Sequence, residues 1–415
     1  MSSFVDVAII GAGPYGLSVA AHLRALGIDH RIFGKPMQLW REHMPHGMRL
    51  KSDGGSSDLV DPDDALTLKK YCAANGIEHH DSMIPVKLDT FVAYGMAFQK
   101  RFVPNVEEKF VTTMERVANG FILRFDDNDT VIARRVVLAV GVAAFKFMPE
   151  FLTGLPEEFV THASRYGSFD ALHGKNITVM GGGASAIDCG GLLADIGEDV
   201  SVMTRRDSIE FHAPPGHRSW KNRLRSPNTG IGSGWRLRIF HDQPLAFHVL
   251  PTSIRHKQAA ALLGPSTGWF MKDSIVGKVP LLTDLTPRHA EVRHGKLHIE
   301  ATNQFNAIKT IVTDHLVSAT GYKIDLRKLD FLPDTLRAQI RQVNHTPALS
   351  THFETSVSGL YVVGPASLHS FGPLVRFVHG ARYTARRIAP FLAASLTRGH
   401  AAAVAPVPQT APAVG

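Results

Sequence analysis

Apolar positions near the start of the chain predict a strand, a turn and a helix in immediate succession. Residues 4–10 (FVDVAII) form an apolar run typical of a buried strand, and residues 14–26 (PYGLSVAAHLRAL) carry apolar positions at helical spacing. Gly27 ends this helix, and residues 30–34 predict a second strand. A strand–helix–strand order of this kind predicts an α/β fold with a parallel, doubly wound sheet.

The same order returns in the middle of the chain. Residues 176–180 predict a strand, residues 186–197 a helix and residues 199–206 the next strand. Between the two units, residues 111–141 show short alternating runs separated by turn residues, which is typical of a β-meander. Two late strands and a long helix complete the prediction, at 315–321, 359–364 and 375–396.

Both strand-to-helix turns carry glycines at the spacing that binds a dinucleotide. The pattern G-x-G-x-x-G/A is met by Gly11, Gly13 and Gly16, and again by Gly181, Gly183 and Ala186. The first glycine permits a tight turn, the second lets the backbone approach a pyrophosphate, and the third position lets helix and strand pack closely. The amino terminus of the helix then faces the phosphate with free N–H groups. We therefore expect two dinucleotide sites.

The residue that ends the following strand distinguishes the two nucleotides. After the second turn, Thr204 occupies the position where a carboxylate would repel a phosphate, and Arg205 and Arg206 follow it. Guanidinium groups bind phosphate, so this turn predicts an NADP site. After the first turn no acid stands near Gly34. Either backbone groups bind the ribose there, or Lys35 adds a contact on the adenosine side.

Composition and charge narrow the class further. The chain has 415 residues, of which 44% are hydrophobic and 20% charged, as expected for a two-domain globular protein. It contains no run of 18 uncharged apolar residues, so we expect no membrane contact and a cytoplasmic location. The net charge of +8 is not gathered into blocks, which argues against nucleic-acid binding and suits anionic cofactors. Cys72 and Cys189 form no CxxC pair, which disfavours a dithiol relay and a metal cluster.

The order of the motifs resembles that of the FAD- and NADPH-dependent monooxygenases. This class includes the flavin-containing monooxygenases, the Baeyer–Villiger monooxygenases and the lysine and ornithine N-hydroxylases. The stretches that carry the resemblance are GAGPYG, MQLWREHMPHGMRLKS at 37–52, THASRY at 161–166, DHLVSATGY at 314–322 and GLYVVGPAS at 359–367. The resemblance covers residues 4–395 and implies that the first turn holds FAD and the second NADPH.

The domain boundaries follow from this assignment. We expect two Rossmann-like dinucleotide-binding domains, with the NADPH domain (151–320) inserted into the FAD domain (1–150 and 321–397). Within the NADPH domain, residues 207–280 are expected to form an irregular basic insertion, rich in Pro, Gly, His and Arg. This insertion is either a solvated basic face or a surface that gathers an anionic substrate. The Ala/Pro-rich residues 398–415 are expected to be disordered.

The resemblance also implies a reaction. NADPH would reduce FAD, and the reduced flavin would form a C4a-(hydro)peroxide with O₂ that passes one oxygen atom to a small organic substrate. N-hydroxylation is preferred because the ATGY motif is matched best. The family F-x-G-x-x-x-H motif lacks its Phe and Gly before His162, so Baeyer–Villiger and S-oxidation stay open. An NAD(P)H oxidoreductase or oxidase without oxygen insertion, and a non-catalytic nucleotide-binding protein, also fit the two glycine turns. The class often forms pairs or tetramers, and the sequence leaves the oligomeric state open.

The candidate site residues fall into three groups. Candidate FAD contacts are Gly11, Gly13, Pro14, Tyr15, Gly16, Gly34, Lys35, Trp40, Met48, Leu50, Gly141, Gly364, Phe371, Gly372, Pro373 and Leu374. Candidates on the NADPH side are Gly181, Gly183, Ala184, Ser185, Ala186, Thr204, Arg205, Arg206, Ala319, Thr320 and Gly321. Candidates beside the reacting atoms are Lys51, Ser52, Asp58 and Arg376. We expect no metal ligand.

Overall fold

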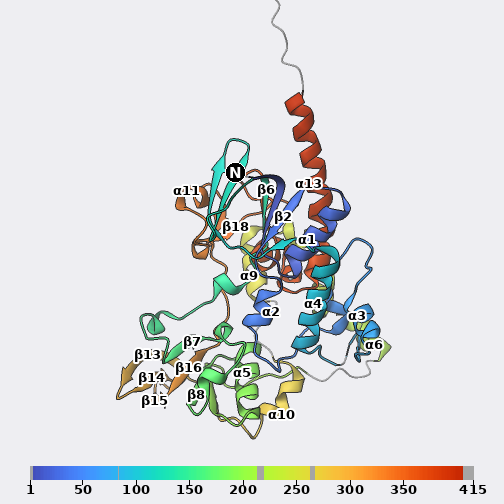
Figure 1. Ribbon diagram of the computed structural model, residues 1–415. Helices are drawn as coiled ribbons and strands as arrows, with labels where there is room; N and C mark the ends of the chain where they lie inside the picture. Colours follow the sequence, from blue (N-terminus) through green and yellow to red (C-terminus); the bar gives the residue numbers. More distant parts are fainter. Residues whose placement is uncertain (1–2, 83, 213–218, 262–266, 405–415) are drawn as a thin grey trace, which may run out of the picture.

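The chain folds into two lobes, the first built on a mixed sheet and the second on a parallel sheet (Figure 1). The computed structural model describes residues 3–82, 84–212, 219–261 and 267–404. The upper lobe in Figure 1 holds the sheet that contains β1, and the lower lobe holds the sheet that contains β8. Within the described ranges, no helix combines the length and the apolar character that crossing a membrane requires.

The sheet of the first lobe has seven strands, in the order β3-β2-β1-β6-β5-β4, with β19 also paired to β6. The strands are β1 (Ser3–Ile10), β2 (His30–Phe33), β3 (Val106–Glu107), β4 (Val111–Val117), β5 (Gly120–Phe125), β6 (Thr130–Leu138) and β19 (Leu360–Val362). Strand β1 runs parallel to both β2 and β6. The far edge of β6 is shared, because its first half pairs antiparallel with β5 and its second half parallel with β19. The end of the chain therefore completes the sheet that its beginning starts.

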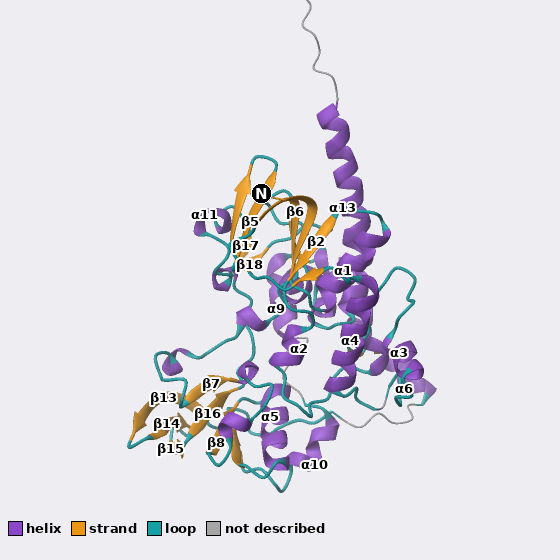
Figure 2. Cartoon of the chain, viewed as in Figure 1, coloured by secondary structure: helices purple, strands orange, loops and turns teal. Residues whose placement is uncertain are grey.

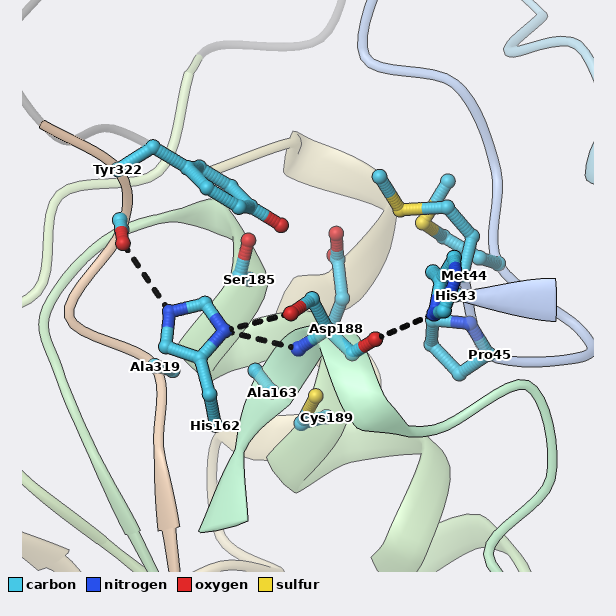
Figure 3. A pocket seen from close by; sticks show the side chains of 13 residues that line it. His43, Met44, Pro45, His162, Ala163, Ser185, Asp188, Cys189, Ala319 and Tyr322 are labelled. Carbon is cyan, nitrogen blue, oxygen red and sulfur yellow. Dashed lines mark hydrogen bonds between the residues drawn. The ribbon is translucent and has the colours of Figure 1, made fainter. Parts of the chain in front are cut away.

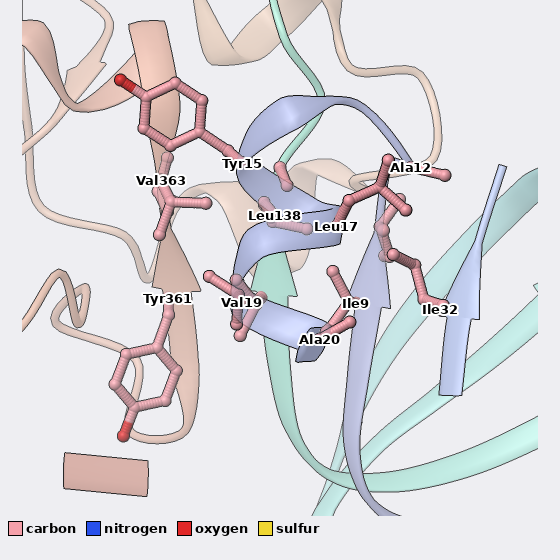
Figure 4. Close-up of a cluster of buried hydrophobic side chains, with 14 of the residues drawn as sticks. Ile9, Ala12, Tyr15, Leu17, Val19, Ala20, Ile32, Leu138, Tyr361 and Val363 are labelled. Atoms are coloured by element: carbon pink, nitrogen blue, oxygen red, sulfur yellow. The ribbon is translucent and has the colours of Figure 1, made fainter. Parts of the chain in front are cut away.

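Helices α1 (Pro14–Ala25), α4 (Leu88–Phe102) and α13 (Gly380–Val404) accompany this sheet. Side chains from β1, α1, β6 and the segment after β19 form one continuous core, in which Ile9, Leu17, Leu138 and Val363 are fully buried (Figure 4). The predicted strand, turn and helix at the start of the chain form as expected, because their apolar faces meet in this core.

The second lobe carries a parallel five-stranded sheet in the order β12-β9-β8-β16-β7. Its strands are β7 (Val160–His162), β8 (Asn176–Met180), β9 (Asp199–Met203), β12 (Leu281–Leu282) and β16 (His315–Ser318), with helices α5 (Ala184–Asp195) and α10 (Lys272–Ile275) beside it. An antiparallel sheet of β13 (Thr286–Arg293), β14 (Lys296–Thr302) and β15 (Ile308–Thr313) continues this lobe. The remaining short elements are α2 (Gln38–Glu42), α3 (Leu68–Ala74), α11 (Asp334–Arg337), α12 (Leu368–Phe371), β17 (Gln342–Val343) and β18 (Thr346–Pro347).

The expectation that residues 207–280 are irregular is wrong for much of the described part of this segment. It forms α6 (Trp220–Arg225), α7 (Trp235–Asp242), α8 (Pro244–His248) and α9 (Thr252–Ala261), and the hairpin β10 (Asn228–Thr229) with β11 (Gly232–Ser233) (Figure 2). Helices α8 and α9 pack against α12 of the first lobe. Phe247 of α8 is fully buried there, and an added Cβ on Gly372 would lie 2.8 Å from its ring. Burial on the other lobe thus stabilises helices that weak local propensity does not predict.

The long helix predicted at 375–396 begins later than expected. Residues Pro373–Arg376 form a separate 3₁₀ turn, and α13 starts at Gly380. The hydroxyl of Tyr15 lies 2.8 Å from the Val375 carbonyl and 2.7 Å from the Phe377 carbonyl, to which it donates. The Val375 carbonyl therefore bonds to a side chain of α1, and the Phe377 carbonyl is shared between Tyr15 and the N–H of Gly380, where α13 starts. Helix α13 extends to Val404, and residues 405–415 lie outside the described part.

Candidate functional site

The backbone around the first glycine turn packs so closely that only glycine fits at two of its three motif positions, Gly11 and Gly16. Gly11 has a φ of +112°, and a Cβ added to it would lie 2.3 Å from the backbone oxygen of Ala139. A Cβ on Gly16 would lie 1.9 Å from the oxygen of Gly11. Gly13 differs, because a Cβ there would meet no protein atom within 4 Å. The protein itself demands glycine at the outer two positions, and the middle one borders open space at the amino terminus of α1.

The second turn repeats this construction. Gly181 has a φ of +154°, and its added Cβ would lie 2.5 Å from the backbone oxygen of Ala319 and 3.1 Å from the Cβ of Ala186. In both lobes the crowding atom is the carbonyl oxygen of the alanine that follows the neighbouring strand, Ala139 after β6 and Ala319 after β16. The two lobes thus present two dinucleotide cradles of the same design.

Thr204 and Arg206 lie beside the second turn, as predicted from the end of the β9 strand. A Cβ on Gly182 would lie 2.5 Å from the Thr204 hydroxyl oxygen and 3.4 Å from Cδ of Arg206. The Arg206 N–H also bonds to the Thr204 hydroxyl at 3.3 Å. Arg205 is exposed, whereas Arg206 is half-buried. Of the two arginines, Arg206 is the one that packs against the turn.

No acidic residue stands at the end of β2 beside the first turn, but Glu42 of α2 lies next to Lys35 there. The ammonium of Lys35 lies 3.4 Å from a carboxylate oxygen of Glu42, and the Gln38 amide donates to the other oxygen at 3.0 Å. The Gln38 hydrogen bond, followed by Lys35, lowers the pKa of Glu42. Gly34 takes a φ of +118° next to this pair.

The two lobes meet at a small pocket of about 30 Å³ (Figure 3). The first lobe contributes residues of the loop from His43 to Met48, and the second contributes Ser185, Ala319 and Gly321. Four of the predicted residues therefore line the pocket, namely Met48, Ser185, Ala319 and Gly321. Nδ1 of His43 lies 2.9 Å from the Ser164 carbonyl oxygen. The loop after α2, which includes the predicted FAD contact Met48, thus lies against the second lobe near Ser185, a contact that the sequence did not predict.

His162 fixes the chain where it crosses between the lobes. Its Nε2 lies 3.0 Å from the Gly321 carbonyl, and its Nδ1 lies 2.8 Å from the Ser164 hydroxyl (Figure 3). The chain crosses between the lobes twice, after β6 and again after β16, and Gly321 belongs to the second crossing. The two crossings run side by side, because the Phe147 N–H donates to the Gly321 carbonyl at 2.9 Å.

Asp188, which the sequence motifs did not single out, is the titratable group at the centre of the pocket wall. It sits on α5, one turn after the second glycine motif. Burial raises the pKa of its carboxyl to about 7, although the positive charge of Lys51 opposes the shift. The ammonium of Lys51 has a lowered pKa because it is partly buried, with Asp188 raising it and Arg376 lowering it further. Lys51 is thus brought into electrostatic range of a carboxyl from the other lobe, and Arg376 into range of Lys51. The only available signal in the sequence was an acid near the start of the helix that follows the second glycine turn.

Several predicted polar residues make structural bonds. The Asp58 carboxylate accepts the N–H of Leu68 at 2.7 Å and so caps the start of α3. The Thr320 hydroxyl donates to the Phe147 carbonyl at 2.5 Å and ties the two crossings together. Ser52 is half-buried near the start of the loop that leads to Asp58.

The predicted aromatic contacts lie mainly against other aromatic rings. Trp40 meets Phe91 edge-on, with ring centres 4.8 Å apart. Phe371 is fully buried and stacks on Phe353, with ring centres 3.9 Å apart. The other predicted positions occupy turns and helix starts, with Pro14 and Ala184 opening α1 and α5, Gly141 and Gly364 at positive φ after β6 and β19, Leu50 buried before the loop to Asp58, and Gly372, Pro373 and Leu374 in the buried turn before α13.

Both cysteines are buried and unpaired with each other. Cys189 lines the interlobe pocket, where burial and the neighbouring Asp188 raise the pKa of its thiol to about 12. A thiol of this kind is a poor nucleophile at neutral pH. In the described part of the chain, no three His, Cys, Asp or Glu side chains gather into a group that could hold a metal ion.

Comparison with known proteins agrees with this geometry. The model of the pyridine nucleotide-disulphide oxidoreductase family matches residues 5–225, so the chain belongs to this family. The ferredoxin–NADP reductase of Streptococcus pyogenes serotype M28 is 28% identical over 212 residues, which are 50% of this chain and 56% of the reductase. The chain thus spans about half the length of the curated relatives that it matches.

Solved structures match the whole fold. The ornithine N-hydroxylase of Kutzneria sp. 744, with reduced FAD, NADP⁺ and L-ornithine, is similar with a TM-score of 0.75 and 16% identity, over 95% of this chain and all of that chain. The FAD-bound cadaverine monooxygenase of Erwinia amylovora gives 0.73 and 18%, over 94% and 95%. The predicted α/β fold with two dinucleotide-binding domains and the predicted resemblance are confirmed. The prediction of an oxidoreductase is confirmed by the family.

Proposed function

We propose that the protein is an NADPH-dependent FAD monooxygenase that acts on a small organic amine. The reaction is R–NH₂ + O₂ + NADPH + H⁺ → R–NHOH + H₂O + NADP⁺. The observation that carries the proposal is the pair of matching glycine cradles, one on each lobe, together with a pocket between the lobes that Ser185 of the second cradle lines. A dinucleotide on each cradle would bring the two reactive rings toward this pocket. The N-hydroxylases of similar fold supply the substrate class.

The first cradle fits FAD. Its first and third glycines are demanded by the protein backbone, whereas Gly13 faces space that a pyrophosphate can fill. The chemistry that bound FAD supplies is hydride acceptance from NADPH and activation of O₂. The chain's own residues bind, exclude water and hold protons. The loop from His43 to Met48 covers the pocket from the first lobe, and Asp188 holds or releases a proton near neutral pH.

The second cradle fits NADPH better than NADH. Arg206 packs beside the turn, at the position where a 2′-phosphate would lie, and Thr204 leaves that position without negative charge. We expect Arg206→Gln to raise the KM for NADPH by roughly tenfold or more while leaving the KM for NADH within about twofold. Arg205→Gln, which changes an exposed arginine, is the matched control. Equal effects of the two substitutions would contradict the role of Arg206.

The alternative is an NAD(P)H oxidoreductase that reduces a protein or dye and inserts no oxygen, which the sequence match to ferredoxin–NADP reductase favours. Disulfide reduction is disfavoured, because Cys189 has a raised pKa and no neighbouring thiol among the described residues. The test is to supply FAD-loaded protein with NADPH, O₂ and a panel of amines that includes ornithine and cadaverine. Hydroxylamine formed in proportion to NADPH consumed supports the monooxygenase. NADPH consumption that yields only hydrogen peroxide, together with rapid ferredoxin reduction, would favour the alternative.

A further inference from the structure

A second cavity, of about 580 Å³, lies between α7, the loop that precedes β19 and the first turns of α13. This volume falls within the range of about 300–1,000 Å³ that is typical of small-molecule sites. None of its lining residues also lines the interlobe pocket. Leu374, from the turn before α13, forms part of its wall.

Three arginines of α13 line this cavity and are held in place by bonds on their outer sides. Nη1 of Arg382 and Nη2 of Arg386 donate to the same carboxylate oxygen of Asp64, at 2.7 and 2.9 Å. Nε of Arg387 donates to the Thr351 carbonyl at 2.5 Å. In the described part of the chain these bonds occupy one N–H of each guanidinium, which carries five. Donors remain on each of the three groups for a ligand.

The charge of the cavity lining is positive. On the α7 side, Arg238 pairs with Asp242, whose carboxylate also binds Nδ1 of His241 at 2.6 Å. Three arginines and one carboxylate, that of Asp242, line the cavity itself. Outside the lining, Asp64 pairs with Arg382 and Arg386, and Asp58 and Glu354 interact electrostatically with Arg382 and His352, respectively. An anion is therefore the ligand that this cavity attracts.

Two further features point to an acceptor-rich ligand. Tyr383 lines the cavity, and its hydroxyl oxygen is buried with no hydrogen-bond partner in the described part of the chain. Buried polar groups are rarely left unpaired, so a ligand oxygen is the natural partner. His241 and His379 also line the cavity and stack on each other, with their Nε2 atoms 2.8 Å apart.

We propose that this cavity is a binding site for an oxyanion-bearing small molecule, carboxylate or phosphate, which Arg386 and Arg387 grip and to which Tyr383 donates a hydrogen bond. Guanidinium groups bind both kinds of oxyanion through paired N–H groups. The site goes beyond the proposed function, since it is separate from both glycine turns and from the interlobe pocket. It gives the chain a specific use for the excess positive charge at the start of α13.

The test is equilibrium binding of citrate and of inorganic pyrophosphate by calorimetry. The full-length protein is used with FAD and NADP⁺ in excess, so that neither probe competes for the glycine turns. We expect one probe to bind, and the Arg386→Gln/Arg387→Gln variant to weaken it roughly tenfold or more. Arg116→Gln/Arg124→Gln, at exposed positions of β4 and β5 outside the cavity lining, is the charge-matched control and should bind as the wild type does.

Tyr383→Phe is a second variant that keeps the test valid if the double variant fails to fold. It removes a hydroxyl that has no hydrogen-bond partner among the described residues. It should weaken binding by roughly threefold without lowering the unfolding midpoint. Preference for citrate would identify a carboxylate ligand, and preference for pyrophosphate a phosphate ligand. Failure of both probes to bind at millimolar concentration, or equal binding by the wild type and the double variant, would overturn the proposal. The assay needs no turnover, so its result is independent of whether the protein proves to be a monooxygenase.

Discussion

At the scale of single residues, Asp188 has the most consequential environment in the interlobe pocket. Its carboxyl has a pKa of about 7, against an ordinary value of 3.8, because burial disfavours the charged form. Between these two values the folded protein holds a proton that the unfolded chain releases. Stability therefore declines as pH rises from about 4 to about 7, by at most about 1.4 kcal/mol per pH unit from this group, and its contribution is lost above that range.

Asp188→Asn removes this titration and keeps the shape of the side chain. We expect the variant to be more stable than the wild type at pH 8, with the difference shrinking toward pH 5 and below. Urea unfolding across this pH range measures it. Asp330→Asn, at an exposed position, should keep the wild-type slope. An unchanged slope in Asp188→Asn would show that the carboxyl titrates normally.

The glycines of the first turn separate the needs of the fold from the needs of a ligand. A Cβ at Gly16 would lie 1.9 Å from a backbone oxygen, so Gly16→Ala should destabilise the protein by about 1–3 kcal/mol. A Cβ at Gly13 meets no protein atom, so Gly13→Ala should change stability by no more than about 1 kcal/mol. It should nevertheless weaken FAD binding by roughly tenfold or more. Urea unfolding of the FAD-free variants and flavin retention distinguish the two effects, and normal FAD binding by Gly13→Ala would contradict the cradle.

At the scale of elements, both βαβ units were predictable, because glycine turns and apolar runs are local signals. The positions of Thr204 and Arg206 beside the turn followed from the same signals. The start of α13 was not predictable, because Tyr15, 360 residues away from Val375, takes the Val375 carbonyl that a continuous helix would use. Asp188 was missed for a similar reason, since its pKa depends on burial by the other lobe.

Helices α7, α8 and α9 show the same dependence on distant contacts. Phe247 is fully buried and lies edge-on to Phe240, with ring centres 5.1 Å apart. Phe247→Ala should cost about 3–5 kcal/mol and expose this segment to proteolysis, because the cavity removes its anchor on α12. Val249→Ala, at a side chain that is 78% exposed, should change stability by no more than about 0.5 kcal/mol. Equal protease resistance in the two variants would show that these helices are stable without the first lobe.

At the scale of the whole molecule, the two crossings between the lobes form a paired connection. Phe147 bonds to Gly321, and the Lys323 N–H donates to the Phe145 carbonyl at 2.8 Å. Lys146 and Tyr322 pair as an antiparallel bridge between these bonds, so the two connecting segments are tied to each other where they pass between the lobes.

The pocket between the lobes, with a volume of about 30 Å³, is far smaller than the roughly 300 Å³ or more of an ordinary ligand site, so we expect the lobes to separate when a dinucleotide binds. In the loop between the pocket residues Pro45 and Met48, the N–H of His46 donates to the Gly167 carbonyl of the second lobe at 2.9 Å. We expect addition of NADP⁺ to the FAD-loaded protein to speed hydrogen exchange at this N–H, as the loop moves away from the second lobe. Amides in the centre of β1 and β6 should exchange at unchanged rates, because their ladders lie within one lobe. Unchanged or slower exchange at His46 would mean that the nucleotide binds without separating the lobes, and the nicotinamide would then have to approach the first cradle by another path.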